Sequence, residues 1–355
     1  MTTRIKPDAN RKRAPRAIDM FSGCGGLTVG LKRAGYRVIG AIENDFQAVR
    51  SYRANHKDVA IWNSDIRKLP VVRMMRRLRL RRGRLELLAG CPPCQGFSDL
   101  RTRNRSRRRF DMRNSLIDEF LRFVRGLLPR AVLLENVPAL ADHWRFAHFR
   151  KAMQRLGYEE VVAVQDAADF GVPQRRRRLI YMAVRGRAPS LPQPRKRPRT
   201  VRDALRGLPP AGSSGDRLHD LPETRSPAVQ QLIRLVPPDG GSRSDLPRRF
   251  WLPCHRETDG FSDVYGRMRW NSPAPTITSG CHNPSKGRFL HPSAHRNITL
   301  REAALLQGLP RTYRFSRTVG KEALALQIGN ALPPQLVAAH ARRLRIATKP
   351  SAAQK

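Results

Sequence analysis

Acidic and aromatic residues are scarce in this chain of 355 residues. It has 28 Asp and Glu against 69 Lys and Arg, a formal net charge of +41, and only 6% of its residues are Phe, Trp or Tyr. Because so large an excess of one charge repels itself in a compact fold, a polyanionic partner is the direct explanation. Charge alone leaves nucleic acid and an anionic membrane both open, and genomic base composition is a second source of arginine.

Long apolar runs and a secretory signal are also lacking. No run approaches the ~20 apolar residues that span a bilayer, and residues 1–16 are basic without the apolar core of a signal peptide. The five cysteines are an odd number in a long chain, which fits a reducing compartment better than a disulfide framework. We therefore expect a cytoplasmic protein of bacterial type with no membrane partner.

From residue 17 onward, short apolar strands alternate with helical segments. The expected strands cover residues 17–21, 38–42, 59–62, 85–89, 131–135, 160–164 and 179–184. About seven strands with intervening helices predict an α/β fold with a doubly wound sheet. Since no full helix fits between the last two strands, we expect the sheet to finish antiparallel.

The alternation stops at Arg185, which suggests a division into domains. Residues 186–262 are rich in Pro, Gly, Ser and Arg, and in them we expect one short helix over 226–235. Further helices are expected over 299–306 and 335–346. The predicted parts are a basic disordered arm (1–16), a catalytic and cofactor-binding domain (17–185), a smaller loop-rich region (186–295), a segment returning to the first domain (296–346) and a disordered tail (347–355).

A glycine turn follows the first strand. The segment Phe21 to Leu27 holds three glycines, which allow positive φ and close approach to a ligand. Glu43 ends the second strand, where a carboxylate can hydrogen-bond ribose hydroxyls. Thr28 stands at the third glycine position of the dinucleotide fingerprint, and no Walker lysine follows. An adenosine without phosphates fits better, with S-adenosylmethionine as the candidate; a tight turn beside a surface glutamate is the alternative.

The segment Gly90 to Ser98 contains two prolines and two cysteines. The prolines hold Cys94 on a rigid turn at the carboxyl end of a predicted strand, the edge where open α/β sheets place their chemistry. Cys94 is therefore a candidate nucleophile. The segment by itself also allows a buried structural thiol, or a Cys91–Cys94 pair that binds zinc or cycles between redox states.

Three charged residues are candidates for the same edge. Glu135 ends the strand 131–135, and parallel neighbours would bring it to the rim of Cys94, partly desolvated and suited to carry a proton. A helix N-cap or an ion-pair partner is the alternative for Glu135. Alternation along an extended segment sends Arg176 and Arg178 to one side, where they could activate the thiol and anchor a substrate. Taken alone, this arginine run is also typical of a solvated basic patch.

The ordered set of motifs resembles the DNA (cytosine-5) methyltransferase family over nearly the whole ordered length. The matching residues are Asp19 to Gly26, Glu43, Asp65-Ile66, Pro93-Cys94-Gln95, Glu135-Asn136-Val137, Gln174-x-Arg176-x-Arg178, Arg296 to Pro310 and Gln327 to Ala331. They occur in the family's order, and no catalytic position is missing.

The resemblance implies a Rossmann-like, S-adenosylmethionine-dependent methyltransferase sheet with a target-recognition region over 186–295. It implies that Cys94 attacks C6 of a cytosine flipped out of double-stranded DNA. Glu135 would hydrogen-bond the ring at N3 and the amine, Arg178 would hold O2, and Arg176 would support the thiolate and Glu135. Cys91 is then expected to be a packing residue, and no metal is expected.

The resemblance also assigns binding residues. The residues expected to bind the cofactor are Phe21, Gly23, Gly25, Gly26, Leu27, Glu43, Asn44, Asp65, Ile66, Pro93, Asn330 and Ala331. The residues expected to contact DNA are Gln95, Ser98, Arg101, Arg103 and Arg105. We expect a monomer associated with the nucleoid, either the modification enzyme of a restriction–modification system with a separately acting endonuclease or an orphan methylase.

Three other functions are weighed against this one. The tRNA-methylating branch of the family carries a Cys-Phe-Thr signature in its variable region, which this chain lacks. A zinc-binding nucleic-acid module could use Cys91, Cys94, Cys254-His255 and Cys281-His282, although these pairs lie far apart and are not repeated. A non-enzymatic regulator is the least favoured, because the set of catalytic residues is intact.

Overall fold

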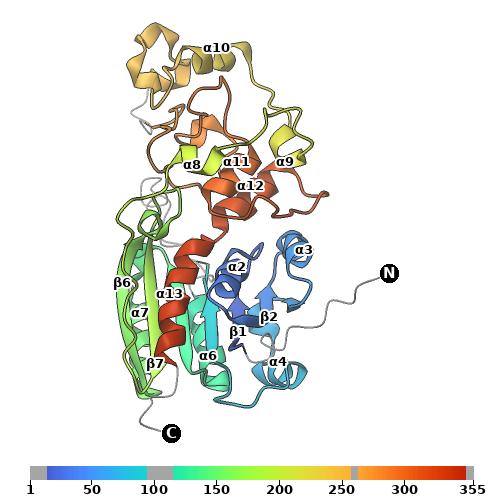
Figure 1. Ribbon diagram of the computed structural model, residues 1–355, viewed down its shortest axis with the longest axis vertical. Coiled ribbons are helices and arrows are strands. Elements are labelled where there is room, and N and C mark those ends of the chain that lie inside the picture. The colour runs from blue at the N-terminus through green and yellow to red at the C-terminus, as the bar shows by residue number, and fades with distance from the viewer. Residues whose placement is uncertain (1–13, 94–114, 257–262, 349–355) are drawn as a thin grey trace. The chain divides into compact units, whose positions relative to one another are not determined.

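The computed structural model describes residues 14–93, 115–256 and 263–348 (Figure 1). The chain divides into two compact units. The first comprises Met1–Gln165, Arg177–Gln193 and Leu336–Lys355, and the second comprises Asp166–Arg176 and Pro194–Gln335. Among the described residues, no helix is long and apolar enough to cross a membrane.

The first unit is built on a seven-stranded sheet of order β3-β2-β1-β4-β5-β7-β6. The strands are β1 (Arg16–Met20), β2 (Arg37–Glu43), β3 (Ala60–Asn63), β4 (Leu87–Gly90), β5 (Ala131–Asn136), β6 (Tyr158–Asp166) and β7 (Arg177–Arg185). Neighbours from β3 to β5 are parallel, and β7 runs antiparallel to β5. All seven predicted strands, the doubly wound sheet and the antiparallel finish are confirmed. Strands β1, β4 and β5 are apolar runs because both of their faces are buried.

The helices of the first unit pack on this sheet. They are α2 (Gly26–Arg33), α3 (Phe46–Asn55), α4 (Val71–Arg77), α6 (Leu116–Leu127), α7 (Trp144–Arg155) and α13 (Pro334–Ala347), with short 3-10 turns η1 (Ile66–Lys68), η3 (Pro138–Leu140) and η4 (Ala167–Phe170). Helix α6 shows why they form: its apolar positions recur with helical spacing and are buried as one face.

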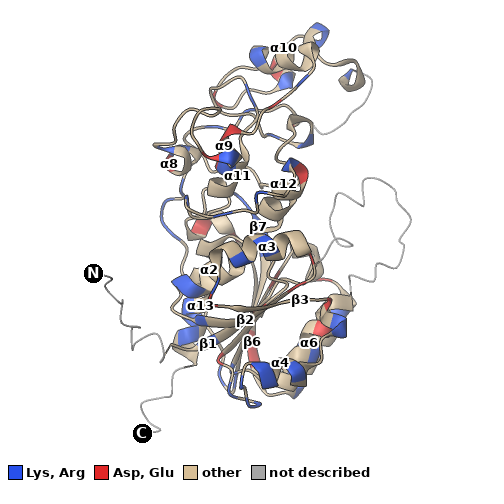
Figure 2. Ribbon diagram, turned by 90° about the vertical axis from the view of Figure 1, so that its right-hand side faces the viewer, with Lys and Arg blue, Asp and Glu red and all other residues tan. Residues whose placement is uncertain are grey.

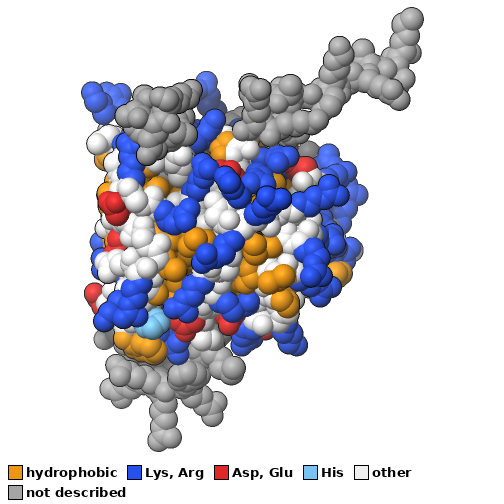
Figure 3. Space-filling model, turned by 90° about the horizontal axis from the view of Figure 1, so that it is seen from below, with side chains coloured by type: hydrophobic (Ala, Val, Ile, Leu, Met, Phe, Trp, Pro, Cys, Tyr) orange, Lys and Arg blue, Asp and Glu red, His pale blue; other side chains and the backbone are white. Residues whose placement is uncertain are grey.

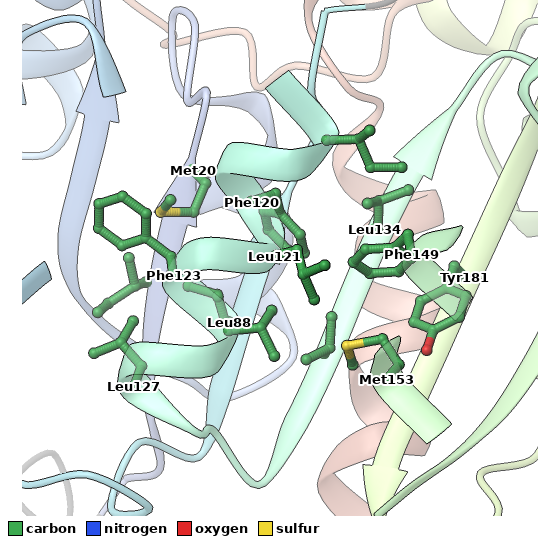
Figure 4. Close-up of a cluster of buried hydrophobic side chains, with 14 of the residues drawn as sticks. Met20, Leu88, Phe120, Leu121, Phe123, Leu127, Leu134, Phe149, Met153 and Tyr181 are labelled. Carbon is green, nitrogen blue, oxygen red and sulfur yellow. The ribbon is translucent and has the colours of Figure 1, made fainter. Parts of the chain in front are cut away.

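The core of the first unit includes a cluster of large apolar side chains between α6, α7 and the sheet (Figure 4). Phe120 and Phe149 are fully buried there, and burying such a side chain contributes roughly 1.5–3 kcal/mol. Gly90 ends β4 against this core: a Cβ there would lie 2.8 Å from Phe120 Cε2 and 2.9 Å from Met20 Cβ. A glycine is therefore required where the chain leaves β4 for the Pro-Pro turn.

The described part of the second unit consists of short helices and turns. It contains α8 (Val201–Leu205), α9 (Arg217–Asp220), α10 (Pro227–Leu235), η5 (Arg243–Asp245), η6 (Arg248–Phe250), η7 (Pro253–His255), η8 (Pro284–Lys286), α11 (Leu300–Leu306) and α12 (Lys321–Asn330). The helices predicted over 226–235 and 299–306 correspond to α10 and α11, whereas α12 was not predicted. Helix α11 begins at a capping box of Thr299 and Glu302. Because α11 packs against α8, α9 and α12, residues 296–335 lie in the second unit, and the chain rejoins the first at Leu336.

A fully buried arginine holds the irregular part of the second unit together. The guanidinium of Arg267 donates to the carbonyl oxygens of Ile233 (2.7 Å), Val236 (2.9 Å) and His291 (2.9 Å). It also contacts the Ala294 carbonyl oxygen and His295 Nδ1. Burial lowers the pKa of Arg267, but its donors meet acceptors, which is the condition for burying such a group. The charge lies next to a small apolar core that includes Leu232 and Leu290.

Positive charge is distributed over elements of both units. Lys and Arg side chains lie on helices and turns of both units (Figure 2). The face drawn in Figure 3 is dense with Lys and Arg side chains, between which apolar patches are small. This distribution fits the polyanionic partner that composition predicts.

Candidate active site

The glycine turn that follows β1 has backbone angles that allow a ligand to come close to the main chain. Gly23 and Gly25 have φ of 53° and 106°, and Phe21 also has a positive φ of 61°. The turn is pinned by hydrogen bonds from Ser22 N to Ile42 O (3.0 Å) and from Gly25 N to Ser22 O (2.9 Å). A Cβ at Gly23 would meet no atom within 4 Å. The turn therefore has open space on one side, while Gly26 and Leu27 are buried at the start of α2.

Glu43 lies beside this turn at the end of β2. Its Oε2 accepts a hydrogen bond from Gly23 N (2.8 Å), and its Oε1 accepts from Asn44 N and Asp45 N (2.9 Å each). Burial raises the pKa of Glu43. Three backbone amides thus fix the carboxylate against the glycine turn. Its assignment to ribose hydroxyls remains a prediction.

A buried polar group that sequence reasoning missed lies directly under the turn. Thr28 Oγ1 donates to Asp19 Oδ2 (2.6 Å) and lies 2.8 Å from the hydroxyl of Tyr52. Burial raises the pKa of Asp19 to about 8, and its Oδ1 has no hydrogen-bond partner among the described residues. Thr28, which separates this turn from the dinucleotide fingerprint, is therefore the partner of a buried carboxyl group.

Asp65 and Ile66 complete this edge of the sheet. Parallel pairing places Glu43 beside Asn63, so the segment after β3 lies at the same carboxyl edge as Glu43. Asp65 caps η1 and pairs with Arg67 Nη2 at 2.6 Å, and this hydrogen bond lowers the pKa of Asp65. Ile66 is buried in the main core. Of this pair, only Asp65 is partly exposed.

Glu135 lies at the end of β5, next to the segment that leads to Cys94. Strand pairing sets Gly90 beside Leu134, so the Pro-Pro turn and Glu135 share one edge. Glu135 is 3% exposed, and its Oε1 lies 2.9 Å from Arg178 Nε in an ion pair. The structure thus brings together two of the four predicted catalytic residues, Glu135 and Arg178.

Cys91 is not merely the packing residue that we expected. Its Sγ donates to Glu135 Oε2 at 2.6 Å. The reason is that β4 ends at Gly90, so the next side chain leaves the core and reaches the end of the neighbouring strand β5. The carboxylate of Glu135 is therefore held from two sides, by Arg178 and by Cys91.

Asn136 anchors the turn that precedes Cys94. Its Nδ2 donates to Pro92 O (3.0 Å), and its Oδ1 accepts from Val137 N (2.9 Å). The described part of this segment ends at Pro93. Cys94 lies outside the described residues, as do the predicted DNA contacts Gln95, Ser98, Arg101, Arg103 and Arg105, and these assignments remain predictions.

The predicted alternation of the arginine run is visible in the burial of its members. Arg176 is buried and Arg178 is half-buried, whereas Arg175 and Arg177 are exposed. Arg176 donates from Nη1 to Ile277 O and from Nη2 to Gly329 O, each at 3.0 Å. These bonds tie it to backbone of the second unit. Its predicted support of the thiolate and of Glu135 remains a prediction.

A pair of buried glutamines holds the segment that carries Asn330 and Ala331. Gln307 Nε2 donates to the carbonyl oxygens of Ile328 (2.9 Å) and Ala331, and Gln174 Nε2 donates to Gln307 Oε1. The end of α12 is thereby fixed within the second unit. The role of Asn330 and Ala331 in cofactor binding remains a prediction.

Three further thiols lie among the described residues. Cys24 and Cys281 are buried, and burial raises the pKa of each to about 12, so both are unreactive. Cys254 is exposed. Within the described ranges, no three His, Cys, Asp or Glu side chains gather as a metal site.

Known proteins match this chain over residues of both units. The sequence profile of the C-5 cytosine-specific DNA methylase family matches residues 16–345. The type II methylase M.HgiDII of Herpetosiphon aurantiacus is 34% identical over 337 residues, covering 90% of this chain and 92% of that protein. The type II methyltransferase M1.HphI of Haemophilus parahaemolyticus is 32% identical, covering 91% and 84%.

A solved structure shares the fold. The crystal structure of an E. coli prophage protein described as a DNA modification methyltransferase superimposes with a TM-score of 0.68 at 26% identity, covering 94% of this chain and 99% of that one. The S. pombe Dnmt2 methyltransferase superimposes with a TM-score of 0.59 at 19% identity. The profile match and the two relatives identify the chain as a member of the C-5 cytosine-specific DNA methylase family.

Proposed function

We propose that the carboxyl edge of the first unit's sheet methylates C5 of a flipped cytosine in double-stranded DNA through Cys94. Membership of the family makes the chain a DNA (cytosine-5) methyltransferase. The observation that carries the site assignment is Glu135, buried at this edge between Arg178 and Cys91. It lies beside the segment that leads to the candidate nucleophile.

S-adenosylmethionine fits the residues at the other end of this edge. The open side of Gly23 gives room for a ligand, and the fixed carboxylate of Glu43 is placed to accept hydrogen bonds from ribose hydroxyls. Asp19 Oδ1, which has no hydrogen-bond partner among the described residues, lies under the glycine turn, where a positively charged ligand would favour the ionised form of the carboxyl group. When bound, the cofactor supplies the electrophilic methyl group that C5 accepts.

The protein's own part in the reaction is to make C5 nucleophilic. Cys94 thiolate attacks C6, forming an S–C6 bond and moving the C5–C6 electron pair toward C5. Glu135, hydrogen-bonded to N3 and the exocyclic amine, stabilises the charge that the attack places on the ring. Arg178 holds O2 and keeps the carboxylate of Glu135 in place. After methylation, the C5 proton leaves to solvent as the S–C6 bond breaks and the thiolate departs.

This chemistry requires the base to leave the helix, because C6 must be approached from above the ring. Flipping costs a few kcal/mol, and the basic surface supplies favourable contacts with phosphates. The type II names of the relatives support a modification enzyme of a restriction–modification system, acting on the bacterial nucleoid as a monomer. An orphan methylase is the second candidate.

One assay separates this function from its alternatives. Purified full-length protein is incubated with S-adenosylmethionine that carries a labelled methyl group and with unmethylated plasmid DNA or tRNA. We expect 5-methylcytosine in DNA at one short sequence, which bisulfite sequencing identifies. Label in tRNA, or on the exocyclic amine of cytosine, would contradict the proposal. Tightly bound zinc with no methyl transfer would instead favour the nucleic-acid module.

A further inference from the structure

A basic cavity in the second unit is not part of the site described above. It has a volume of about 370 Å³, and its lining residues include Arg175, Arg269 and Arg288 together with Gly240 and Ala274. The lining set contains no Asp or Glu. Three guanidinium groups around one cavity are a concentration of positive charge that a neutral ligand does not explain.

Arg288 forms a fixed wall of this cavity. Its Nη1 donates to the carbonyl oxygens of Gly240 (2.9 Å), Gly241 (3.1 Å) and Arg267 (3.0 Å). Since Arg267 is itself buried and anchored to α10, the wall belongs to the hydrogen-bonded framework of the unit. Its guanidinium is therefore held in place before any ligand arrives.

Arg175 also lines the cavity. Its backbone is paired with the segment that follows Pro273, through Arg175 N to Ala274 O (2.8 Å) and Thr276 Oγ1 to Arg175 O (2.8 Å). The side chain is 63% exposed and reaches Asp166 at 3.2 Å. Because solvent reaches this guanidinium, its ion pair with Asp166 is screened, and the guanidinium can rearrange onto a second anion.

Arg269 is the exposed member of the three. Its side chain lies against Gly240, where a Cβ would come within 2.4 Å of Arg269 Nε. Any larger residue at position 240 would displace the arginine from the cavity. Gly240 therefore leaves room for the side chain of Arg269. The guanidinium of Arg269 has no carboxylate partner among the residues that line the cavity.

We propose that this cavity binds a backbone phosphate of the DNA substrate, an inference that rests on the proposed function. Guanidinium groups match phosphate oxygens in geometry and charge. The alternative interpretation, a solvated basic face, predicts side chains spread apart, whereas these three line one cavity. Because phosphate contacts fix position and carry no base sequence, the cavity would set the register of the recognition region on DNA.

The test is the salt dependence of DNA binding. Full-length wild type, Arg269→Ala and the control Arg317→Ala are titrated with a duplex that holds the methylated sequence. Arg317 is also exposed, lies in the same unit and is not among the residues that line the cavity. One lost phosphate contact lowers the slope of log K against log salt by about 0.9. We expect that decrease and severalfold weaker binding in Arg269→Ala only, and a further decrease in Arg175→Ala/Arg269→Ala.

A slope in Arg269→Ala equal to that of wild type, or a decrease of the same size in Arg317→Ala, would overturn the cavity assignment. Inorganic phosphate is titrated into the same proteins by calorimetry. Phosphate binding that is lost in Arg269→Ala while the DNA slope is unchanged would make the cavity a site for free phosphate and overturn the proposal. Methyl transfer by wild type is measured in parallel, so that a failure of the proposed function is distinguished from a failure of the cavity.

Discussion

Each of the two units buries an ionisable side chain, and the hydrogen bonding of the two side chains differs. In the first unit, Asp19 lies under the glycine turn with one oxygen bonded to Thr28 and the other without a hydrogen-bond partner among the described residues. In the second, the donors of Arg267 meet backbone carbonyl groups. A fully bonded buried charge organises a fold, whereas an incompletely bonded one is typical of a site that awaits a ligand.

The same contrast applies to the units as a whole. The first derives its order from a regular sheet whose carboxyl edge presents Glu43 and Glu135. The described part of the second derives its order from side chains that bind backbone, namely Arg267, Arg288 and Gln307. The proposed function assigns the chemistry to the regular edge of the first unit and the recognition of DNA sequence to the irregular second unit.

The largest effect is expected from Glu135→Gln, which tests whether the carboxyl edge of the first unit's sheet takes part in the chemistry. A positioned acid–base group contributes roughly 10²–10⁴-fold to a rate, so kcat for methyl transfer should fall by that range while DNA affinity changes little. Glu86→Gln is the control, because Glu86 is paired with Arg16 near the opposite end of β4. Near-normal turnover in Glu135→Gln would remove Glu135 from the mechanism.

A change at Arg267 should lower the stability of the second unit, whereas Glu135→Gln should lower the catalytic rate. Arg267→Met leaves several buried carbonyl groups without donors, at about 1–3 kcal/mol for each unsatisfied group. We expect a loss of at least about 3 kcal/mol in the free energy of unfolding, with weakened DNA binding and retained cofactor binding. Arg269→Met, on an exposed neighbour, should change stability by less than about 0.5 kcal/mol. Equal stability of both variants in denaturant unfolding would refute the organising role of Arg267.

Glu135 and Arg267 also show which parts of the structure can be predicted from the sequence. The strands follow from apolar runs, whereas Glu135 and Arg178 meet because β7 pairs with β5, a neighbour that sequence order did not predict because β6 comes between them in the chain. Arg267 could not be identified, since its acceptors come from residues 24 to 34 positions away along the chain. Cys91 was misjudged because the contact of its thiol depends on the residue at which β4 ends.

A third effect is expected from Asp19→Asn, measured as stability against pH. Burial raises the pKa of Asp19 from 3.8 to about 8. The folded state therefore keeps a proton that the unfolded state has lost between these two values. This contribution to stability is complete below about pH 4, falls as the pH rises, and is lost above about pH 8. Asp19→Asn should remove that fall, and Asp58→Asn, on a half-exposed surface pair, should keep it.

An unfolding profile of Asp19→Asn that follows wild type between pH 4 and 8 would mean that Asp19 ionises normally in the fold. The contrast drawn between Asp19 and Arg267 would then be wrong for Asp19. Bound S-adenosylmethionine sharpens the test, since a positively charged ligand above an ionised Asp19 should reduce the pH dependence of wild type only.

The central claim is that Cys94 forms a covalent bond to C6 of cytosine in DNA. DNA carrying 5-fluorocytosine at the methylated position blocks release, because fluorine cannot leave as the C5 proton does. Incubation with the wild-type chain and S-adenosylmethionine should give a stable species with the mass of protein plus methylated DNA, attached at Cys94, and Cys94→Ala should give none. Absence of the adduct in wild type, or the same adduct in Cys94→Ala, would contradict the account.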